Sequence, residues 1–311
     1  MRKLRTRLFL STAVLPAILL STCCHMSVAE KNCKRIKVLI VDGFSNHDWR
    51  LTTLLTKNIL DSSKLFSVDV STAPASQESQ EWDTWHPRFS GYDVVIQNCN
   101  SYGGRPEWPA EVRHDLEKFV SGGGGLYILH SANNAFPKWK EYNKMIGLGW
   151  RGKKYGQAVT IDSNGVVVMV PPGQGGSTSH GKRIDAILTR LGEHPIHKGL
   201  PRQWKVADLE IYRYARGPAT NMTVISYARE PATGFNFPTE WVVKYGKGNV
   251  YNSTFGHVWK GDTNPPAMRC VAFQTLLTRA VEWLSGHGVT SPVPDDFPDE
   301  KNIQLRPART D

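Results

Sequence analysis

Three histidines of this sequence come where predicted β-strands end. His130 directly follows the apolar run LYIL, and His257 closes the run NVYNSTFG. His47 follows the run IKVLIV after a short polar stretch. Imidazole exchanges protons near neutral pH without any tuning of its pKa, and in its neutral form it binds transition metals. These positions therefore predict proton transfer, metal binding, or both.

One carboxylate joins the histidines in this pattern, because Glu210 lies in the segment DLEIY. Two schemes use the four residues. In the first, the imidazoles of His47, His130 and His257, together with the carboxylate of Glu210, hold a divalent ion such as Zn²⁺ with one position left open. In the second there is no metal, one histidine is the base, and Glu210 is the acid or orients the histidine. The histidines lack the H-x-x-x-H spacing of a helical zinc site, which favours the metal-free scheme.

Further polar and aromatic residues occupy comparable positions and are candidates for substrate binding. They are Asp42, Asn98, Ser131, His194, Asp208, Tyr212 and Trp241. Each is weak evidence alone, since a single histidine is usually a hydrogen-bonded structural residue and a tryptophan in a strand is usually core. Their joint placement at the ends of predicted strands is what favours a site.

The elements that position these residues follow from hydrophobic periodicity. Continuous apolar runs predict buried strands, and apolar residues spaced three to four apart predict helices. The strands are expected at 36–41, 66–70, 92–96 and 126–129, and the helices at 47–60 and 107–120. This alternation predicts an α/β fold with a mostly parallel sheet and helices on both faces. Because the carboxyl ends of parallel strands share one edge, His130 and His257 are expected within about 10 Å of each other.

The second half of the chain has a different order of predicted elements, with several strands in succession. It predicts a β-hairpin at 157–170, followed by four further strands at 209–213, 224–228, 240–245 and 249–253. A closing helix is predicted at 266–284. Residues 288–311, rich in proline and charge, are expected to form a loose C-terminal tail. No linker divides the part between, so residues 30–287 are expected to form one domain.

The first 29 residues have the pattern of a secretory signal peptide. Four basic residues precede the apolar run 8–20, and Ser27-Val28-Ala29 offers small side chains before a cleavage point at Glu30. This predicts export to the periplasm or the extracellular space. The alternative is a lipoprotein anchored to the membrane at Cys23, because Leu20-Ser21-Thr22-Cys23 approaches a lipobox.

Charge and cysteine content exclude some classes of function. Removal of residues 1–29 lowers the net charge from +10 to +6, and no basic run with interleaved aromatics is present, so no nucleic-acid partner is expected. Cys33, Cys99 and Cys270 remain, an odd number that gives no disulfide framework and leaves their pairing open.

Four motifs together resemble one known family. They are GGGGLYILHSA (122–132), GEHPIHKGLP (192–201), DLEIY (208–212) and PTEWVVKYGKGNVYNSTFGH (238–257). From about residue 36 to residue 283 the sequence resembles the ThuA-like (trehalose utilisation) family. The resemblance implies a flavodoxin-like fold that is a variant of the class I glutamine amidotransferase-like fold, with added β-hairpins.

The resemblance also bears on the chemistry. Glutamine amidotransferases carry a nucleophilic cysteine where this chain has His130 and Ser131, so it is not expected to be one. The family implies a carbohydrate ligand, and the expected function is the processing of a disaccharide or (3-keto-)glycoside by hydrolysis, elimination or isomerisation. The alternative is a non-catalytic carbohydrate-binding or assembly module. Residues 149–154 (GWRGKK) stand where many members carry His-Pro, a departure that favours this alternative. The oligomeric state is left open.

Overall fold

β1 (Ile36–Asp42) lies inside a parallel sheet. Its neighbours are β2 (Phe66–Thr72) and β3 (Val94–Gln97), and beyond β3 come β4 (Gly125–Leu129) and β14 (Gly248–Ser253). Each of these pairings is parallel. The computed structural model describes residues 35–307, so the predicted signal peptide lies outside the described residues. The predicted α/β fold with a parallel central sheet is confirmed.

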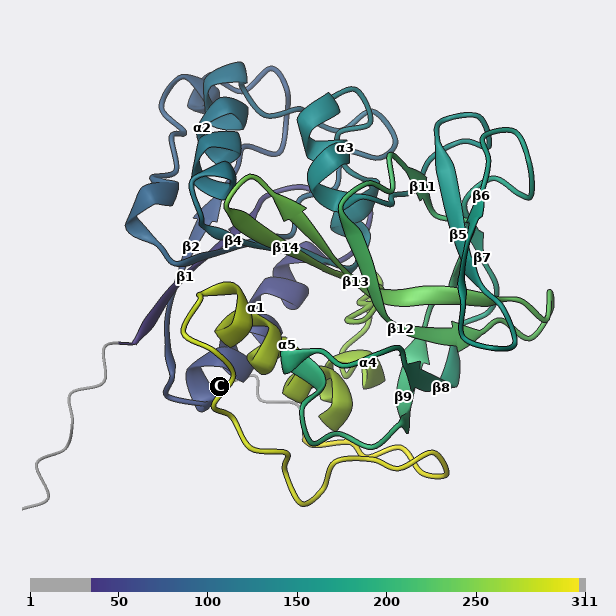
Figure 1. Cartoon of the computed structure of the whole chain (residues 1–311). Coiled ribbons are helices and arrows are strands. Elements are labelled where there is room, and N and C mark those ends of the chain that lie inside the picture. The colour runs from purple at the N-terminus through teal and green to yellow at the C-terminus, as the bar shows by residue number, and fades with distance from the viewer. Residues whose placement is uncertain (1–34, 308–311) are drawn as a thin grey trace, which may run out of the picture. The chain divides into compact units, whose positions relative to one another are not determined.

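Helices cover both faces of this sheet (Figure 1). They are α1 (Trp49–Ser62), α2 (Ala110–Ser121), α3 (Lys140–Ile146), α4 (Pro266–Arg269) and α5 (Val271–Leu284), with 3₁₀ turns η1 (Gln80–Asp83), η2 (Phe89–Gly91), η3 (His130–Asn134) and η4 (Pro195–His197). Strand pleating divides the core, because successive side chains point to opposite faces. In β1, Val38 and Ile40 pack with α1 and α5, whereas Leu39 and Val41 pack with α2 and α3.

An antiparallel extension continues the sheet beyond β14. Its strands, in spatial order, are β13 (Asn236–Tyr245), β12 (Met222–Arg229), β8 (Ile184–Arg190) and β9 (Gln203–Leu209). A branch is formed by β5 (Gln157–Ile161), β6 (Val167–Val170) and β11 (Arg216–Gly217), and a separate pair by β7 (Ser179–His180) and β10 (Tyr212–Arg213). The predicted hairpin at 157–170 is the antiparallel pair β5–β6.

Two sequence-based predictions about the second half are wrong. The strand expected at 209–213 is divided, because β9 ends at Leu209 and the next strand, β10, begins at Tyr212 and pairs with β7 instead of β8. The tail is not loose: Val293, Phe297 and Ile303 pack against the core, and Leu305 forms a β-bridge with Cys270. Spaced apolar residues among prolines bury surface without regular structure, which periodicity does not detect.

The two cysteines that the structure describes are free. Cys99 and Cys270 are buried and do not pair with one another, while Cys33 lies outside the described residues. In the described part of the chain no helix has the length and apolar character needed to cross a membrane.

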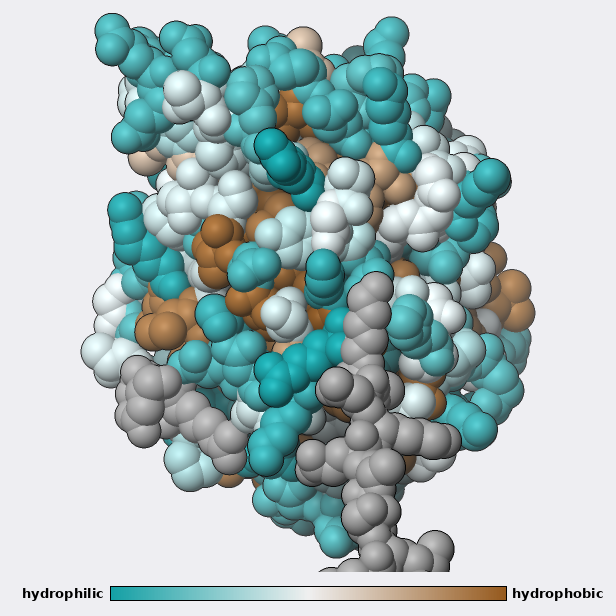
Figure 2. Space-filling view, turned by 90° about the vertical axis from the view of Figure 1, so that its left-hand side faces the viewer, coloured by the Kyte–Doolittle hydropathy of each residue, from teal (hydrophilic) through white to brown (hydrophobic). Residues whose placement is uncertain are grey.

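The side of the molecule that carries β1 and β2 is mostly hydrophilic, with apolar residues showing between polar ones (Figure 2).

The strand order creates a switch point at the carboxyl edge of the sheet. The chain leaves β1 for β2 on one side and later adds β3 and β4 on the other. At such a point the loops that follow neighbouring strands diverge and leave a crevice, which is where open α/β sheets bind ligands. The loops after β1, β3, β4 and β14 all leave from this edge.

Candidate active site at the carboxyl edge of the sheet

Three imidazoles and one carboxylate meet at the carboxyl edge of the sheet. His47, His130, Glu210 and His257 each offer one ligand atom, and these atoms lie within 4.8 Å of one another. All four side chains are buried. The ring centroids of His130 and His257 are 5.1 Å apart, well inside the separation expected from the topology. We call these four residues the His–Glu cluster.

His130 is positioned by the turn between β4 and η3. Its φ of 45° is in the left-handed region, which few residues other than glycine adopt and which often marks functional sites. Its Nδ1 lies 2.9 Å from the backbone oxygen of Thr254, which follows the neighbouring strand β14. Since a carbonyl oxygen only accepts, Nδ1 carries the hydrogen and Nε2 is left with a lone pair. That Nε2 is buried and has no hydrogen-bond partner.

His47 is held by the loops after β1 and β3. Its Nδ1 lies 3.0 Å from Oδ1 of Asn46, and the same oxygen accepts a hydrogen bond of 2.7 Å from Nδ2 of Asn100. The amide oxygen accepts, so Nδ1 of His47 also carries the hydrogen and its Nε2 is open. The backbone N–H of Asp48 donates to the backbone oxygen of Val258, which joins this loop to the loop of His257.

His257 and Glu210 complete the cluster from the second half of the chain. Nε2 of His257 lies 3.4 Å from Oε1 of Glu210, and Nε2 of His130 lies 3.7 Å from Oε2. Gly256 brings His257 into place with a φ of 85°, and a Cβ there would come within 3.1 Å of the Phe273 ring. Glycine suits this position because it adopts positive φ without a steric penalty.

Burial keeps the histidines of the cluster neutral. It lowers the pKa of both His47 and His130 to about 4, since the charged form loses its hydration. The carboxylate of Glu210 partly opposes this at His130. The pKa of His257 is also lowered by burial, and the neighbouring His130 and His47 lower it further. Neutral imidazoles beside a carboxylate can accept protons or bind a metal ion.

The rim of the cluster contains residues that the sequence analysis did not select. Nε2 of His180 lies 3.7 Å from Oε1 of Glu210, and its side chain is 40% exposed. The ring centroid of Trp259, which is 46% exposed, is 5.0 Å from that of His47. Trp150 contacts both His180 and Tyr212. Trp259 follows the His257 motif closely enough to have been chosen, whereas His180 sits in a two-residue strand with no pattern of its own.

The predicted substrate-binding residues divide into those that lie near the carboxyl edge of the sheet and those that are used elsewhere in the fold. Tyr212 and Asp208 lie at the site: the Tyr212 ring centroid is 5.8 Å from that of His130, and Asp208 forms an ion pair of 3.1 Å with Arg183. Ser131 is buried in η3 beside His130. Asp42 is buried at the end of β1, and burial raises the pKa of its carboxyl. Asn98 donates to Thr53 and to the backbone of Trp49, so it anchors α1.

Two predicted residues are used elsewhere in the fold. Trp241 is fully buried on β13, and its indole N–H donates to the backbone oxygen of Ile146 at 2.7 Å. It belongs to the core and has no surface left for a ligand. His194 starts η4, where its ring centroid is 4.8 Å from that of Trp283. Neither position supports the predicted role in substrate binding.

The comparisons with known proteins decide the family. The sequence profile described as ThuA, trehalose utilisation, matches residues 37–284, which is most of the chain. This protein belongs to the ThuA family. A ThuA-like protein from Parabacteroides merdae is 33% identical over 88% of this chain and 98% of its own, with a TM-score of 0.81. Membership of the ThuA family points to a sugar-related role.

More distant likenesses add nothing on function. A cytoplasmic protein of Salmonella typhimurium LT2 is 11% identical over 80% of this chain and 99% of its own, with a TM-score of 0.43. A β-galactosidase from Bacillus circulans sp. alkalophilus is 11% identical over 81% of this chain and 31% of its own, with a TM-score of 0.44. No curated protein matches the sequence.

The site of this ThuA-family chain fits a divalent metal ion. Within residues 35–307 the His–Glu cluster is the group of His, Cys, Asp and Glu side chains whose arrangement suits one. Two of its histidines present open Nε2 atoms and donate their Nδ1–H to oxygens, which is the usual second-shell support of metal-binding histidines. The buried Nε2 of His130, which has no partner, is the kind of atom that a bound ion would satisfy.

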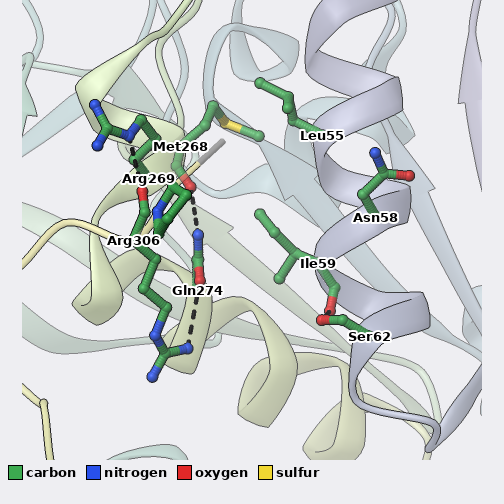
Figure 3. Close-up of a pocket in the computed structure, with 9 residues that line it drawn as sticks. Leu55, Asn58, Ile59, Ser62, Met268, Arg269, Gln274 and Arg306 are labelled. Carbon is green, nitrogen blue, oxygen red and sulfur yellow. Dashed lines mark hydrogen bonds between the residues drawn. The ribbon is translucent and has the colours of Figure 1, made fainter. Parts of the chain in front are cut away.

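The hollow shown in Figure 3 does not compete with this site. It lies between α1 and the segment of α4 and α5, and Leu55, Ile59, Met268 and Arg306 contribute to its lining. Its volume is about 70 Å³. This is far below the roughly 300–1,000 Å³ of small-molecule sites.

Proposed function

We propose that this protein is an exported enzyme that acts on a disaccharide or other glycoside with the help of a divalent metal ion held by the His–Glu cluster. The observation that carries the proposal is the convergence of His47, His130, Glu210 and His257 within 4.8 Å at the carboxyl edge of the sheet. Family membership supports the carbohydrate substrate. The sequence spacing favoured a metal-free scheme, and we propose the metal scheme instead because the four donor atoms converge.

The residues of the cluster divide the chemical work. The imidazoles of His47 and His130 would hold the ion through Nε2, because their Nδ1–H groups are already engaged. When bound, a divalent ion supplies Lewis acidity that polarises a substrate oxygen. Glu210, whose oxygens lie 3.4–3.7 Å from the surrounding imidazoles, has two carboxylate oxygens, so one could bind the ion while the other holds or moves a proton.

The rim supports a sugar ligand. Trp259 offers an exposed ring beside His47 and His257, with its plane inclined by only 14° to that of His257. Trp150 and His180 lie on the side of Tyr212. A pyranose has an apolar face of C–H groups, and aromatic rings offer a matching apolar surface with hydrogen-bonding groups nearby.

The reaction is proposed to be hydrolysis, elimination or isomerisation of a glycoside, with an oxidised (3-keto) sugar as the preferred form. All three reactions move a proton in the transition state. A keto group acidifies the neighbouring C–H, and the carboxylate oxygen of Glu210 that does not bind the ion could accept that proton. The three reactions give different products, so product analysis distinguishes them.

Metal analysis combined with turnover tests the proposal. The purified protein is loaded with Zn²⁺, Mn²⁺ or Fe²⁺, freed of excess ion, and assayed with glucosides and their 3-keto forms. We expect one bound ion per chain and turnover that is lost in His130→Ala. Sugar binding without turnover by any metal form would instead indicate a non-catalytic binding module. His287→Ala, a change of an exposed histidine beyond α5, is the matched control.

A further inference from the structure

The three histidines of the His–Glu cluster are not equivalent, and the difference lies in what each Nδ1 faces. In His47 and His130, Nδ1 faces an oxygen, at 3.0 Å and 2.9 Å respectively. An oxygen acceptor requires a hydrogen on Nδ1, which leaves a lone pair on Nε2. Both rings therefore present a metal-binding atom to the centre of the cluster.

His257 has the opposite arrangement. Its Nδ1 lies 2.7 Å from Nη1 of Arg183. A guanidinium has five N–H donors and no acceptor, so Nδ1 of His257 must supply the lone pair. Because a neutral imidazole carries one hydrogen, that hydrogen sits on Nε2, which points towards Glu210 at 3.4 Å.

Arg183 is itself held in place by two carboxylates. Its Nη1 lies 3.1 Å from Oδ2 of Asp208 and 3.8 Å from Oδ2 of Asp262. Nη1 carries two hydrogens, so one can go to Asp208 while the other goes to His257. Asp208 lies in β9, two residues before Glu210, so one short segment positions both the arginine and the carboxylate of the cluster.

We propose that Arg183 is a positioning residue that keeps His257 as an N–H donor, so that His47, His130 and Glu210 hold the metal ion and His257 does not. This inference rests on the proposed function, and it assigns different roles to the residues of the His–Glu cluster. A metal ion on Nε2 of His257 would require the ring to lose its last hydrogen, because Nδ1 is already committed to Arg183. Two histidines and one carboxylate form a known metal-binding set that leaves positions open for a substrate. The Nε2–H of His257, which faces Glu210, could then also donate to a substrate oxygen bound at the cluster.

Zinc affinity of single variants tests this division. Binding of Zn²⁺ is measured by competition with a chromogenic chelator for His47→Ala, His130→Ala, Glu210→Gln and His257→Gln, with His287→Gln as the control. We expect the first three to weaken binding by more than about 100-fold, and His257→Gln to stay within about threefold of the wild type. Circular dichroism and the thermal midpoint check that each variant is folded.

Two results would overturn the inference in different ways. If His257→Gln weakens Zn²⁺ binding as much as His130→Ala does, His257 is a ligand and the inference fails, while the proposed metal enzyme stands. If the wild type binds no Zn²⁺, or if none of the four changes weakens binding, the proposed metal site and the inference fail together.

Arg183 itself is tested with the His257 ring left intact. In ¹⁵N-histidine-labelled, Zn²⁺-loaded protein, we expect the His257 signals to show a protonated Nε2 and an unprotonated Nδ1. Arg183→Met should abolish this preference without weakening Zn²⁺ binding, whereas Arg190→Met, at the surface ion pair with Glu193, should leave it unchanged. Added guanidinium should restore it in Arg183→Ala. A protonated Nδ1 in the wild type would refute the role of Arg183, and this measurement decides the matter even if His257→Gln does not fold.

Discussion

Nδ1 of His130 lies 2.9 Å from the backbone oxygen of Thr254, a residue 124 positions later in the chain. The contact exists because β4 and β14 are parallel neighbours, with Leu129 paired with Ser253. The residue that follows one strand thus meets the backbone that follows the other. The sheet itself therefore decides which nitrogen of His130 faces the site.

Buried neutral histidines make the stability of the metal-free protein depend on pH. The pKa values of His47, His130 and His194 fall from about 6.5 to about 4 in the folded state. Below pH 6.5 the unfolded chain binds more protons than the folded one, so stability falls as the pH falls towards 4 and levels off below it. For one fully buried histidine the loss is on the order of 3 kcal/mol.

Urea unfolding of the EDTA-treated protein at several values between about pH 7 and pH 4 measures this loss. We expect His130→Asn to flatten the dependence, because the asparagine does not titrate. A free energy of unfolding that is independent of pH in this range would contradict the neutral state of these rings.

Two tryptophans should respond to replacement in opposite ways. Trp259 is 46% exposed beside the cluster, so Trp259→Ala is expected to weaken sugar binding by about 2- to 10-fold with little change in stability. Trp241 is fully buried, so Trp241→Ala is expected to destabilise the protein by about 3–5 kcal/mol. Calorimetric titration with a disaccharide and urea unfolding measure the two effects. Sugar binding unchanged in Trp259→Ala would remove this residue from the proposed site.

The buried contact between His197 and Glu240 should be a major determinant of stability. Nε2 of His197 lies 3.1 Å from Oε2 of Glu240, and Ser226 and Tyr251 donate further hydrogen bonds to the carboxylate. Removing one partner leaves buried polar groups unpaired, so Glu240→Ala is expected to cost about 3–5 kcal/mol. The thermal midpoint provides the measurement. Glu193→Ala, at an exposed pair with Arg190, should cost less than about 0.5 kcal/mol.

The predicted export of the protein can be tested independently of the site, at the N-terminus of the mature chain. The boundary Ser27-Val28-Ala29 predicts that the mature chain begins at Glu30. Intact-mass spectrometry of protein recovered from the periplasm or the medium of an expressing bacterium should show this start. A mass that corresponds to a diacylated Cys23 at the N-terminus would support the lipoprotein alternative instead.

Much of the architecture and the core of the site could be read from local patterns. Apolar runs predicted β1 and β4, and parallel pairing placed His130 and His257 at one edge because strand direction determines where each loop leaves the sheet. The motifs around these residues also indicated the family. These inferences depend on period and order along the chain, which the sequence contains directly.

The identity and the state of the individual site residues depended on tertiary contacts. Trp241 and Trp259 are chemically alike, yet one packs under α3 and the other borders the cluster, because only the fold decides which surface is covered. His180 and Arg183 reach Glu210 and His257 from a segment that has no periodic pattern. The sequence by itself determined that imidazoles and a carboxylate would meet at the strand ends. Only the tertiary structure decided which nitrogen of each ring is open, because that depends on whether an oxygen or a guanidinium from a distant part of the chain lies against it.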